Sequence, residues 1–390
     1  MQGYSEYELG DLLEYEQPTA YIVESTDYSD SYSVPVLTAG KSFILGYTNE
    51  MDGVFDKTPV IIFDDFTTAT QYVNFPFKVK SSAMKILHIN KDLVLPKYIY
   101  YRIQIIQFDH STHKRYWIQQ YSKIRVSIPP IPEQERIVAR IEELFSQLDA
   151  GVETLKKTKA QLAVYRQAVL KEAFEGRLTA SGPEKIVRLG DYIETPRYGT
   201  SKKCSYDDGR DRTAVYRIPN IEHKNGRISH DDIKYAQFTE SELDGIRLQQ
   251  GDILIIRSNG SVSLVGRAAM VCDADITGTF AGYLMRLRIS EPETLLPKFL
   301  LLFLQSHQAR IYIENKAKST SGVHNINSTE ISDLQMPLYD PDTQYAIIEA
   351  IESRLSVCDS IEQTVDTALQ QAEAMRQSIL KKAFEGRLLE

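Results

Sequence analysis

The 390-residue sequence has only three cysteines, Cys204, Cys272 and Cys358, and they lie far apart. A small, odd and scattered set of cysteines excludes a disulfide framework and a cysteine-based zinc site, and it is typical of a reducing compartment. No apolar run approaches the roughly 20 residues that a transmembrane helix needs. The first residues are acidic and polar, unlike a secretory signal peptide. We therefore expect a cytoplasmic protein.

The sequence also lacks the common catalytic motifs. It has no Gly-x-Gly-x-x-Gly, no phosphate-binding lysine loop, no Gly-x-Ser-x-Gly and no Asn-Pro-Pro-Tyr-type methyltransferase box. Asp64 and Asp65 follow an apolar run without a later Glu-x-Lys, so a structural turn is the favoured interpretation. His110 and His113 have a metal-like i, i+3 spacing but no evident third ligand. We predict no catalytic residue and no metal site.

What the sequence does contain is a long internal repeat. Segment 166–178 returns as 376–388, with ten of thirteen positions identical at a constant offset of 210. The same offset holds upstream without a gap as far as Ile137 and Ile347. Shorter matches at other offsets precede both copies. Because such repeats decide the fold, the chain is predicted to be a duplicated unit, each a globular part followed by a long helix.

Both copies of the repeat have the spacing of a coiled-coil helix, with a seam that advances by alternating steps of four and three residues. Pro132 and Pro341 lie where a helix begins, and Gly176 and Gly386 lie where a C′ glycine would end it. A helix with one apolar stripe must bury it, and its own repeat is the simplest partner. The predicted packing residues are Leu148, Val152, Leu155, Leu162 and Val169 in the first copy and Leu355, Ile361, Val365, Leu369 and Ile379 in the second.

The charge distribution is uneven, although the net charge is −8. Residues 1–31 hold eight acidic residues and no Lys or Arg. Residues 78–125 hold ten basic and two acidic residues with aromatics between them, and residues 197–227 hold eight basic and four acidic residues. Clustered Lys and Arg are the electrostatic footprint of phosphate binding. A basic segment ahead of each repeated helix therefore favours a shared anionic partner.

The predicted fold class is α+β, with two mixed α/β domains separated by two long, repeated helices in a coiled coil with internal pseudo-twofold symmetry. The first domain is expected to have strands near 34–38, 59–64 and 73–80 and a helix from 97 to about 108. Strands near 252–257, 265–271 and 283–289 and a helix from 298 to about 313 are expected in the second. The predicted boundaries are 1–130 and 179–338 for the domains and 131–178 and 339–390 for the helices.

The motif at 128–138 (Ile-Pro-Pro-Ile-Pro-Glu-Gln-Glu-Arg-Ile-Val), the helix after it, the doubled Leu-Lys-x-Ala-Phe-x-Gly-Arg-Leu and the opening Leu9-Gly10-Asp11 resemble the specificity subunit of type I restriction–modification systems. The resemblance covers essentially the whole chain. The second copy departs from the pattern at 337–344, where the proline run is looser and longer.

The resemblance implies a non-catalytic DNA-recognition subunit. It implies two target recognition domains, each reading one half of a bipartite, asymmetric site in double-stranded DNA. It also implies antiparallel helices that act as a spacer and offer surfaces to two methyltransferase subunits. No cofactor is implied for this chain itself. S-adenosylmethionine would bind the methyltransferase subunits, and ATP and Mg would serve the partner subunits, which include restriction subunits.

Loop residues with hydrogen-bonding or cationic side chains are the predicted DNA contacts, because phosphate contacts set the register and base-edge contacts specify the sequence. For the first domain they are Lys41, Tyr47, Thr67, Thr68, Lys114 and Arg115, and for the second they are Arg217, Asn220, Arg257, Ser258, Asn259 and Asn325.

Two other classes of protein compete with this interpretation. A scaffold or adhesin would use the duplicated helices only to oligomerise, and it gives no reason for paired basic segments. A self-sufficient nuclease–methyltransferase would need catalytic boxes, which the sequence lacks. A gel shift on duplex DNA with purified methyltransferase subunit, with and without this chain, discriminates between these classes.

Overall fold

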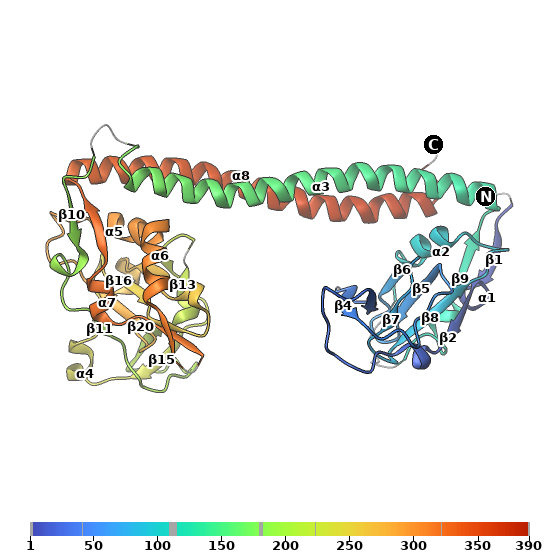
Figure 1. The fold of residues 1–390 in the computed structure, drawn as a ribbon, viewed down its shortest axis with the longest axis horizontal. Helices are drawn as coiled ribbons and strands as arrows, with labels where there is room; N and C mark the ends of the chain where they lie inside the picture. The colour runs from blue at the N-terminus through green and yellow to red at the C-terminus, as the bar shows by residue number, and fades with distance from the viewer. Residues whose placement is uncertain are drawn as a thin grey trace. The chain divides into compact units, whose positions relative to one another are not determined.

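The computed structural model describes residues 3–40, 42–108, 115–178, 182–222, 224–320 and 322–388. The chain forms two compact units, which are residues 1–156 with 366–390 (unit 1) and residues 157–365 (unit 2). Each unit combines a globular domain with one part of each long helix, α3 (Ile131–Phe174) and α8 (Pro341–Phe384) (Figure 1). None of the helices in the described ranges is long and apolar enough to cross a lipid bilayer.

The domain of unit 1 is built on a four-stranded antiparallel sheet in the order β2-β8-β5-β6, beside a three-stranded sheet β4-β3-β7 and a ribbon β1-β9. Its elements are β1 (Ser5–Glu8), α1 (Leu9–Leu12), β2 (Leu13–Glu16), η1 (Pro18–Tyr21), β3 (Val34–Leu37), β4 (Ile44–Thr48), β5 (Val60–Asp64), β6 (Thr70–Val73), β7 (Lys78–Val79), β8 (Met84–Ile89), α2 (Pro96–Ile103), η2 (Tyr121–Lys123) and β9 (Arg125–Ile128).

The domain of unit 2 is built on a sheet in the order β11-β20-β16-β18, beside β15-β12-β19, β17-β22-β21 and the ribbons β10-β23 and β13-β14. Its strands are β10 (Lys185–Arg188), β11 (Arg197–Tyr198), β12 (Arg212–Tyr216), β13 (Ile221–Glu222), β14 (Arg227–Ile228), β15 (Lys234–Gln237), β16 (Ile253–Ile256), β17 (Ser258–Asn259), β18 (Ala268–Met270), β19 (Thr279–Phe280), β20 (Leu284–Leu287), β21 (Lys318–Thr320), β22 (Val323–Asn325) and β23 (Gln335–Leu338). Its helices are η3 (Leu189–Asp191), η4 (Ile218–Asn220), α4 (Glu240–Asp244), η5 (Val262–Leu264), η6 (Asp273–Asp275), α5 (Pro297–Gln305), α6 (His307–Lys316) and α7 (Ser328–Ser332).

Three sheets of unit 1 have counterparts of the same topology in unit 2. The four-stranded sheets correspond strand by strand, and so do the ribbons β1-β9 and β10-β23. In both three-stranded sheets, the central strand has one antiparallel and one parallel neighbour. The duplication predicted from the repeats is therefore present in the tertiary structure of each unit.

Three of the predicted elements differ in the structure. The strand expected over 73–80 is two strands, β6 and β7, with Pro76, which has no N–H to donate to a ladder, between them. The helix expected from 298 to about 313 is broken into α5 and α6 at Ser306, which has an extended backbone. The Ser306 hydroxyl accepts a hydrogen bond from the Ala309 N–H and so caps α6. The helix expected to reach about 108 in unit 1 ends at Ile103.

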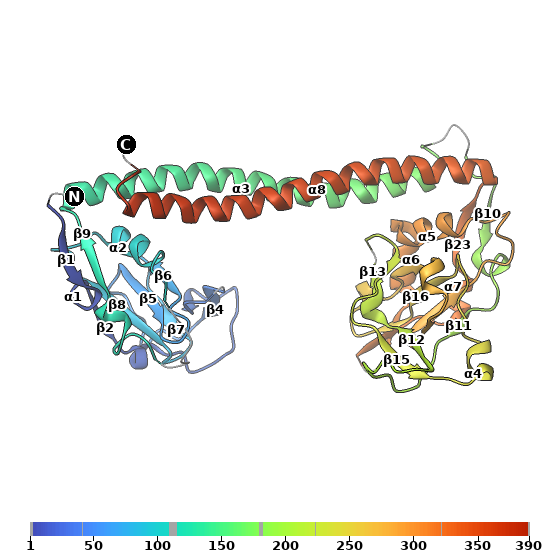
Figure 2. The same ribbon diagram turned by 180° about the vertical axis from the view of Figure 1, so that it is seen from behind.

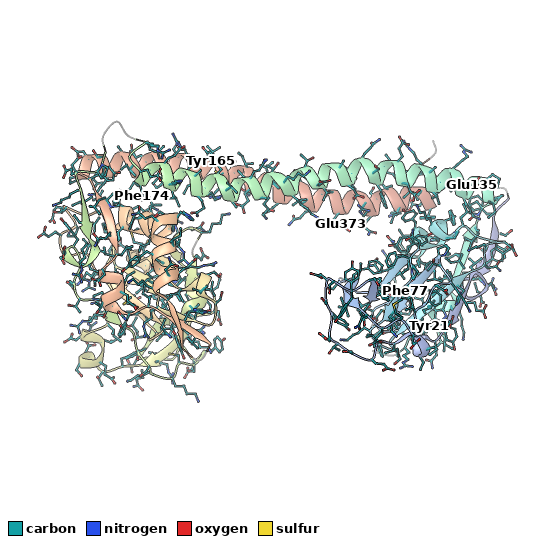
Figure 3. All side chains as sticks on the ribbon, viewed as in Figure 1. Tyr21, Phe77, Glu135, Tyr165, Phe174 and Glu373 are labelled. Atoms are coloured by element: carbon teal, nitrogen blue, oxygen red, sulfur yellow. The ribbon has the colours of Figure 1, made fainter. Side chains whose placement is uncertain are left out.

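One helix of each domain packs against the long helices. Figures 1 and 2 show α2 in unit 1 and α5 in unit 2 on the side of their domains next to the long helices. In unit 1 the rings of Tyr98 and Phe384 lie 5.2 Å apart. In unit 2 Phe174, labelled in Figure 3, lies 5.2 Å from the ring of Phe299 and 5.3 Å from that of Phe303. Aromatic contacts of this kind stabilise the packing of each domain on the helices, because they bury large apolar rings.

Within each unit the two helix segments run antiparallel. Arg376 pairs with Asp149 in unit 1, and the repeat-related Arg166 pairs with Asp359 at 2.7 Å in unit 2. A second pair in unit 2, Arg354 with Glu172 at 3.5 Å, continues the same register. The predicted packing residues are buried or half-buried with one exception, Ile361.

Ile361 is a wrong prediction, because its side chain is 40% exposed. The seam of α8 instead runs through Glu362, which is the repeat of Val152 at the offset of 210. Glu362 is half-buried because cations surround it, with Lys224 at 2.9 Å and Arg166 at 3.0 Å. The hydrogen bond from Lys224 is the main cause that lowers the pKa of Glu362, so the carboxylate stays charged at this position.

Both long helices end as predicted at a glycine. Gly176 has φ +73° and Gly386 has φ +76°, a left-handed conformation that a Cβ atom disfavours. The N–H of Arg177 donates to the Glu172 carbonyl and that of Arg387 to the Lys382 carbonyl, both at 2.9 Å. These bonds satisfy carbonyls that the end of the helix leaves unpaired.

A buried glutamine joins the start of each long helix to its domain. Gln134 has no exposed surface, its Oε1 accepts from the Leu95 N–H at 2.8 Å, and its amide donates to the carbonyls of Leu93 and Pro129. Gln344 repeats all three bonds, with Leu296, Thr294 and Tyr339. The glutamine thus holds the loop that opens α2 or α5 against the N-terminus of the long helix.

Replacing Gln134 with alanine should lower the free energy of unfolding of unit 1 by about 2–4 kcal/mol, because buried backbone groups lose their partners. Urea denaturation of the full chain measures the loss. Gln147→Ala, an exposed position on the same helix, is the matched control and should change little. If Gln134→Ala lowers the free energy of unfolding no more than the control does, the hydrogen bonds of Gln134 make no net contribution to stability.

Candidate nucleic-acid interface

In unit 2, four of the six predicted DNA-contact residues gather where the central strand β16 ends. Arg257 follows β16 directly, and β17 then pairs antiparallel with β22, so that Ser258 lies opposite Asn325. The N–H of Ile326 donates to the Arg257 carbonyl at 2.9 Å and extends this pairing. Arg257, Ser258, Asn259 and Asn325 are therefore brought together by one strand pairing, although about 70 residues separate them in sequence.

Arg257 is held in place by neutral groups. Its guanidinium carbon lies 4.4 Å from the centre of the Tyr198 ring, and its Nη1 donates to the Gly282 carbonyl at 3.1 Å. Its Nε is buried and has no hydrogen-bond partner among the described residues. Stacking on an aromatic face fixes a guanidinium without neutralising it. Tyr198 could not be selected from sequence patterns, because its place beside Arg257 depends on the register of β11 on β20.

A pocket of about 580 Å³ opens beside Arg257. Lys202, Arg217 and Lys234 also line it, as do Ser258 and Gly282. Arg217 is paired with Asp232 at 2.9 Å and Lys202 with Glu242 at 2.7 Å. We call this the Arg257 pocket.

The acidic residue beside the Arg257 pocket is firmly ionised. Hydrogen bonds from Tyr206 and then from Arg217 lower the pKa of Asp232. Lys234 lies over the Tyr206 ring, with its Nζ 4.6 Å from the ring centre. Tyr283 and the cationic side chains line the pocket together, a combination that suits nucleic acid.

Asn220 does not belong to this surface, so its prediction as a DNA contact is wrong. Its side chain has no exposed area, accepts from the Arg217 N–H at 2.9 Å, and donates to the carbonyls of Ser229 and Asp231. With its amide fully used inside the fold, Asn220 shapes the loop that positions Arg217.

In unit 1, Thr67 and Thr68 form the turn that follows β5. The Asp64 carboxylate accepts from the N–H groups of Phe66 and Thr67 at 2.9 and 2.8 Å, and Thr68 has φ +55°, which is uncommon for a β-branched residue. Arg115 lies next to this turn, because the N–H of Tyr116 donates to the Asp65 carbonyl at 3.0 Å. The three predicted contacts Thr67, Thr68 and Arg115 are therefore neighbours.

The other predicted contacts of unit 1 are not placed with this group. Tyr47 is half-buried in β4, which belongs to the other sheet of the domain. Lys41 and Lys114 lie outside the described residues, and so do His110 and His113.

Asp64 and Asp65 serve the fold, as the sequence indicated. Asp65 is buried, accepts from the Trp117 N–H at 2.8 Å and lies 3.5 Å from the Nζ of buried Lys85. In the described ranges, no group of three or more His, Cys, Asp or Glu side chains is placed to hold a metal ion.

The two candidate surfaces occupy equivalent places in the two domains. β5 and β16 are the corresponding central strands, and the Thr67–Thr68 turn and the Arg257 segment both follow them directly. The loops differ in length and chemistry, whereas the framework under them is repeated. Two equivalent sites with different side chains can bind the same kind of ligand, while each site prefers a different variant of that ligand.

A second repeated feature lies where each domain meets its helices. Lys97 pairs with Glu142 in unit 1, and the equivalent Lys298 pairs with Glu352 at 2.8 Å in unit 2. A hollow of about 460 Å³ in unit 1 and one of about 400 Å³ in unit 2 are lined by repeat-related residues. These are Gln104 with Gln305, Glu142 with Glu352, Ser146 with Ser356, Asp149 with Asp359, and Arg376 with Arg166.

Comparison with known proteins finds similarity to specificity subunits of type I restriction enzymes. Residues 1–163 match the family model described as the type I restriction modification DNA specificity domain. The specificity subunit of the EcoR124I/EcoR124II type I restriction enzyme of Escherichia coli is 45% identical over 174 residues, 42% of this chain and 43% of that protein. The EcoKI specificity subunit of E. coli strain K12 is 30% identical over 277 residues, 69% of this chain and 58% of that protein. The chain thus spans about half the length of these curated relatives.

Solved structures share the fold. A chain from a study of complex assembly and conformational transition of the type I R-M system has a TM-score of 0.74, with 99% of both chains covered and 16% identity. The HsdS subunit from Thermoanaerobacter tengcongensis has a TM-score of 0.51, with 99% of this chain and 97% of that one covered and 17% identity. At these identities the likeness concerns the fold alone.

Proposed function

We propose a function from the premise that this chain belongs to the specificity subunits of type I restriction–modification systems. Each of its two domains reads one half of a bipartite, asymmetric site in double-stranded DNA. The observation that carries this proposal is the pair of equivalent surfaces after β5 and β16, which have a repeated framework but different side chains. Because the framework is repeated and the loops differ, the two domains would recognise two different sequences on one DNA molecule.

The long helices, in this proposal, set the distance between the half-sites and carry the partner subunits. The repeated hollows with their Lys–Glu pairs support the same partner for both units, namely one methyltransferase subunit each. Restriction subunits join this complex in the cytoplasm. S-adenosylmethionine, ATP and Mg act in those partners, and this chain supplies recognition without chemistry.

The purified chain alone should bind duplex DNA weakly and should transfer no methyl group. Addition of its methyltransferase subunit should produce sequence-specific adenine methylation, which sequencing of methylated genomic DNA would map to one bipartite site. Methyltransferase subunit without this chain is the control and should methylate no defined site. Methyl transfer by the highly purified chain alone would contradict a purely recognising role.

A further inference from the structure

Two of the cationic side chains that line the Arg257 pocket, Arg257 and Lys234, form no ion pair with the described part of the chain. Four cationic side chains line the pocket, and two of them, Arg217 and Lys202, are paired with carboxylates. In the part of the chain that the structure describes, no carboxylate oxygen lies within 4.0 Å of the Arg257 or Lys234 nitrogens. A half-buried guanidinium without an anion is costly unless a ligand supplies one.

The contacts of Arg257 leave its charge available. The Tyr198 ring and the Gly282 carbonyl hold the guanidinium and direct it, but neither carries a negative charge. Among the described residues, Nη2 donates no hydrogen bond, and the neighbouring Ser258 also lines the pocket. An arginine fork held in this way is suited to the two oxygens of a phosphodiester.

The shape of the site favours a phosphate over a base edge. Phosphates project from the outside of the duplex, whereas base edges lie at the floor of the major groove, about 8.5 Å deep. A protein needs a protruding element to reach a base edge, whereas a recess on the protein can accept a phosphate that projects from the duplex. Arg257 lines a recess of about 580 Å³ together with Tyr283, which is 63% exposed.

We propose that the Arg257 pocket seats a backbone phosphate of the DNA, with the Arg257 guanidinium as its main contact and Lys234 as the second cation. This inference rests on the proposed function and gives the residue a definite task within it. The pocket anchors the second domain on the DNA strand, and base selection falls to the side chains around its rim. The Arg257 pocket would then affect affinity for all sequences and not the choice of sequence.

The test compares the full chain, assembled with its methyltransferase subunits, carrying Arg257→Gln or no change. Binding is measured over a series of salt concentrations on a duplex with the methylated site and on a scrambled duplex. Arg257→Gln should weaken binding to both duplexes by a similar factor of about 10 to 100. The slope of log affinity against log salt should fall by about 0.9. The methylated sequence should stay the same.

Arg247→Gln is the matched control. It removes the same charge from an exposed arginine of the same domain that pairs with Glu240 and lies 3.8 Å from Asp244, outside the pocket. It should leave both affinity and salt slope unchanged. Lys234→Gln, which also changes a cation of the pocket, is a second variant in case Arg257→Gln lowers the melting temperature. It should cause a smaller loss of DNA affinity and the same reduction of the salt slope.

Two results would overturn the proposal. Loss of binding confined to the specific duplex, together with methylation relaxed at one base position, would make Arg257 a base reader. Unchanged affinity and unchanged salt slope in both pocket variants would mean that no DNA phosphate lies in the pocket. A pocket that binds free phosphate, and not DNA, would give this same result. Failure of the proposed function itself is distinguishable, since the unchanged complex would then not prefer the specific duplex.

Discussion

Exchanging residues 182–338 for the corresponding segment of another specificity subunit should change one half of the methylated sequence and leave the other half as it is. The limits follow from the structure. β10 and β23 form one ribbon and must be exchanged together, and Tyr339 must stay because its carbonyl accepts from Gln344 at 2.8 Å. The apolar residues of α3 that face the domain, such as Phe174, remain in the host chain.

Methylated-site sequencing of cells with the chimaera and the host methyltransferase subunit measures the result. The reciprocal exchange of residues 3–128, which takes β1 and β9 together, is the matched control and should change the opposite half-site. A chimaera that alters both half-sites would contradict the assignment of one reader to each domain.

The framework could be predicted from the sequence because local patterns encode it. A seven-residue period placed most packing residues of α3 and α8, and a glycine marked each helix end. The same pattern predicts Ile361 in the seam, which is wrong, because the seam runs through Glu362 one position later. The Glu362 carboxylate is stable in the seam because it forms ion pairs with Arg166 and Lys224. Lys224 lies in a loop more than 100 residues before Glu362 in the sequence.

The candidate site was predictable only in part, for the same reason. Arg257, Ser258 and Asn259 follow a strongly apolar strand and are therefore recognisable as loop residues. Tyr198, which stacks on Arg257, and Lys234, which lines the pocket, are positioned by the pairings of β11 with β20 and of β15 with β12, which periodicity does not reveal. Asn220 shows the opposite error, since a polar residue in a basic segment is buried by three hydrogen bonds to backbone groups.

Two insertions of different length should have opposite outcomes if the helices set the spacing of the half-sites. Seven residues inserted after Lys156 in α3 and seven after Val365 in α8 fall at the boundaries of the two compact units. Each unit then keeps its internal ion pairs, such as Asp149 with Arg376 and Asp359 with Arg166. Seven residues preserve the heptad phase and lengthen a helix by about 10.5 Å.

At about 3.4 Å per base pair, this length corresponds to an unread gap wider by up to about three base pairs. Three base pairs also rotate one half-site by roughly 100° around the duplex, at about 10.5 base pairs per turn. The complex must twist or bend the DNA to compensate, which costs activity. We therefore expect methylation at a site whose half-site bases are unchanged and whose gap is wider by about one to three base pairs, at a lower rate.

Two residues inserted at the same points should abolish methylation. Two residues turn the helix by about 200° and carry the apolar seam to its opposite side, so the buried residues of both helices lose their partners. Methylated-site sequencing measures both variants, and co-purification with the methyltransferase subunit reports assembly. An active seven-residue variant with the original gap would refute the spacer role and leave the helices as docking surfaces alone.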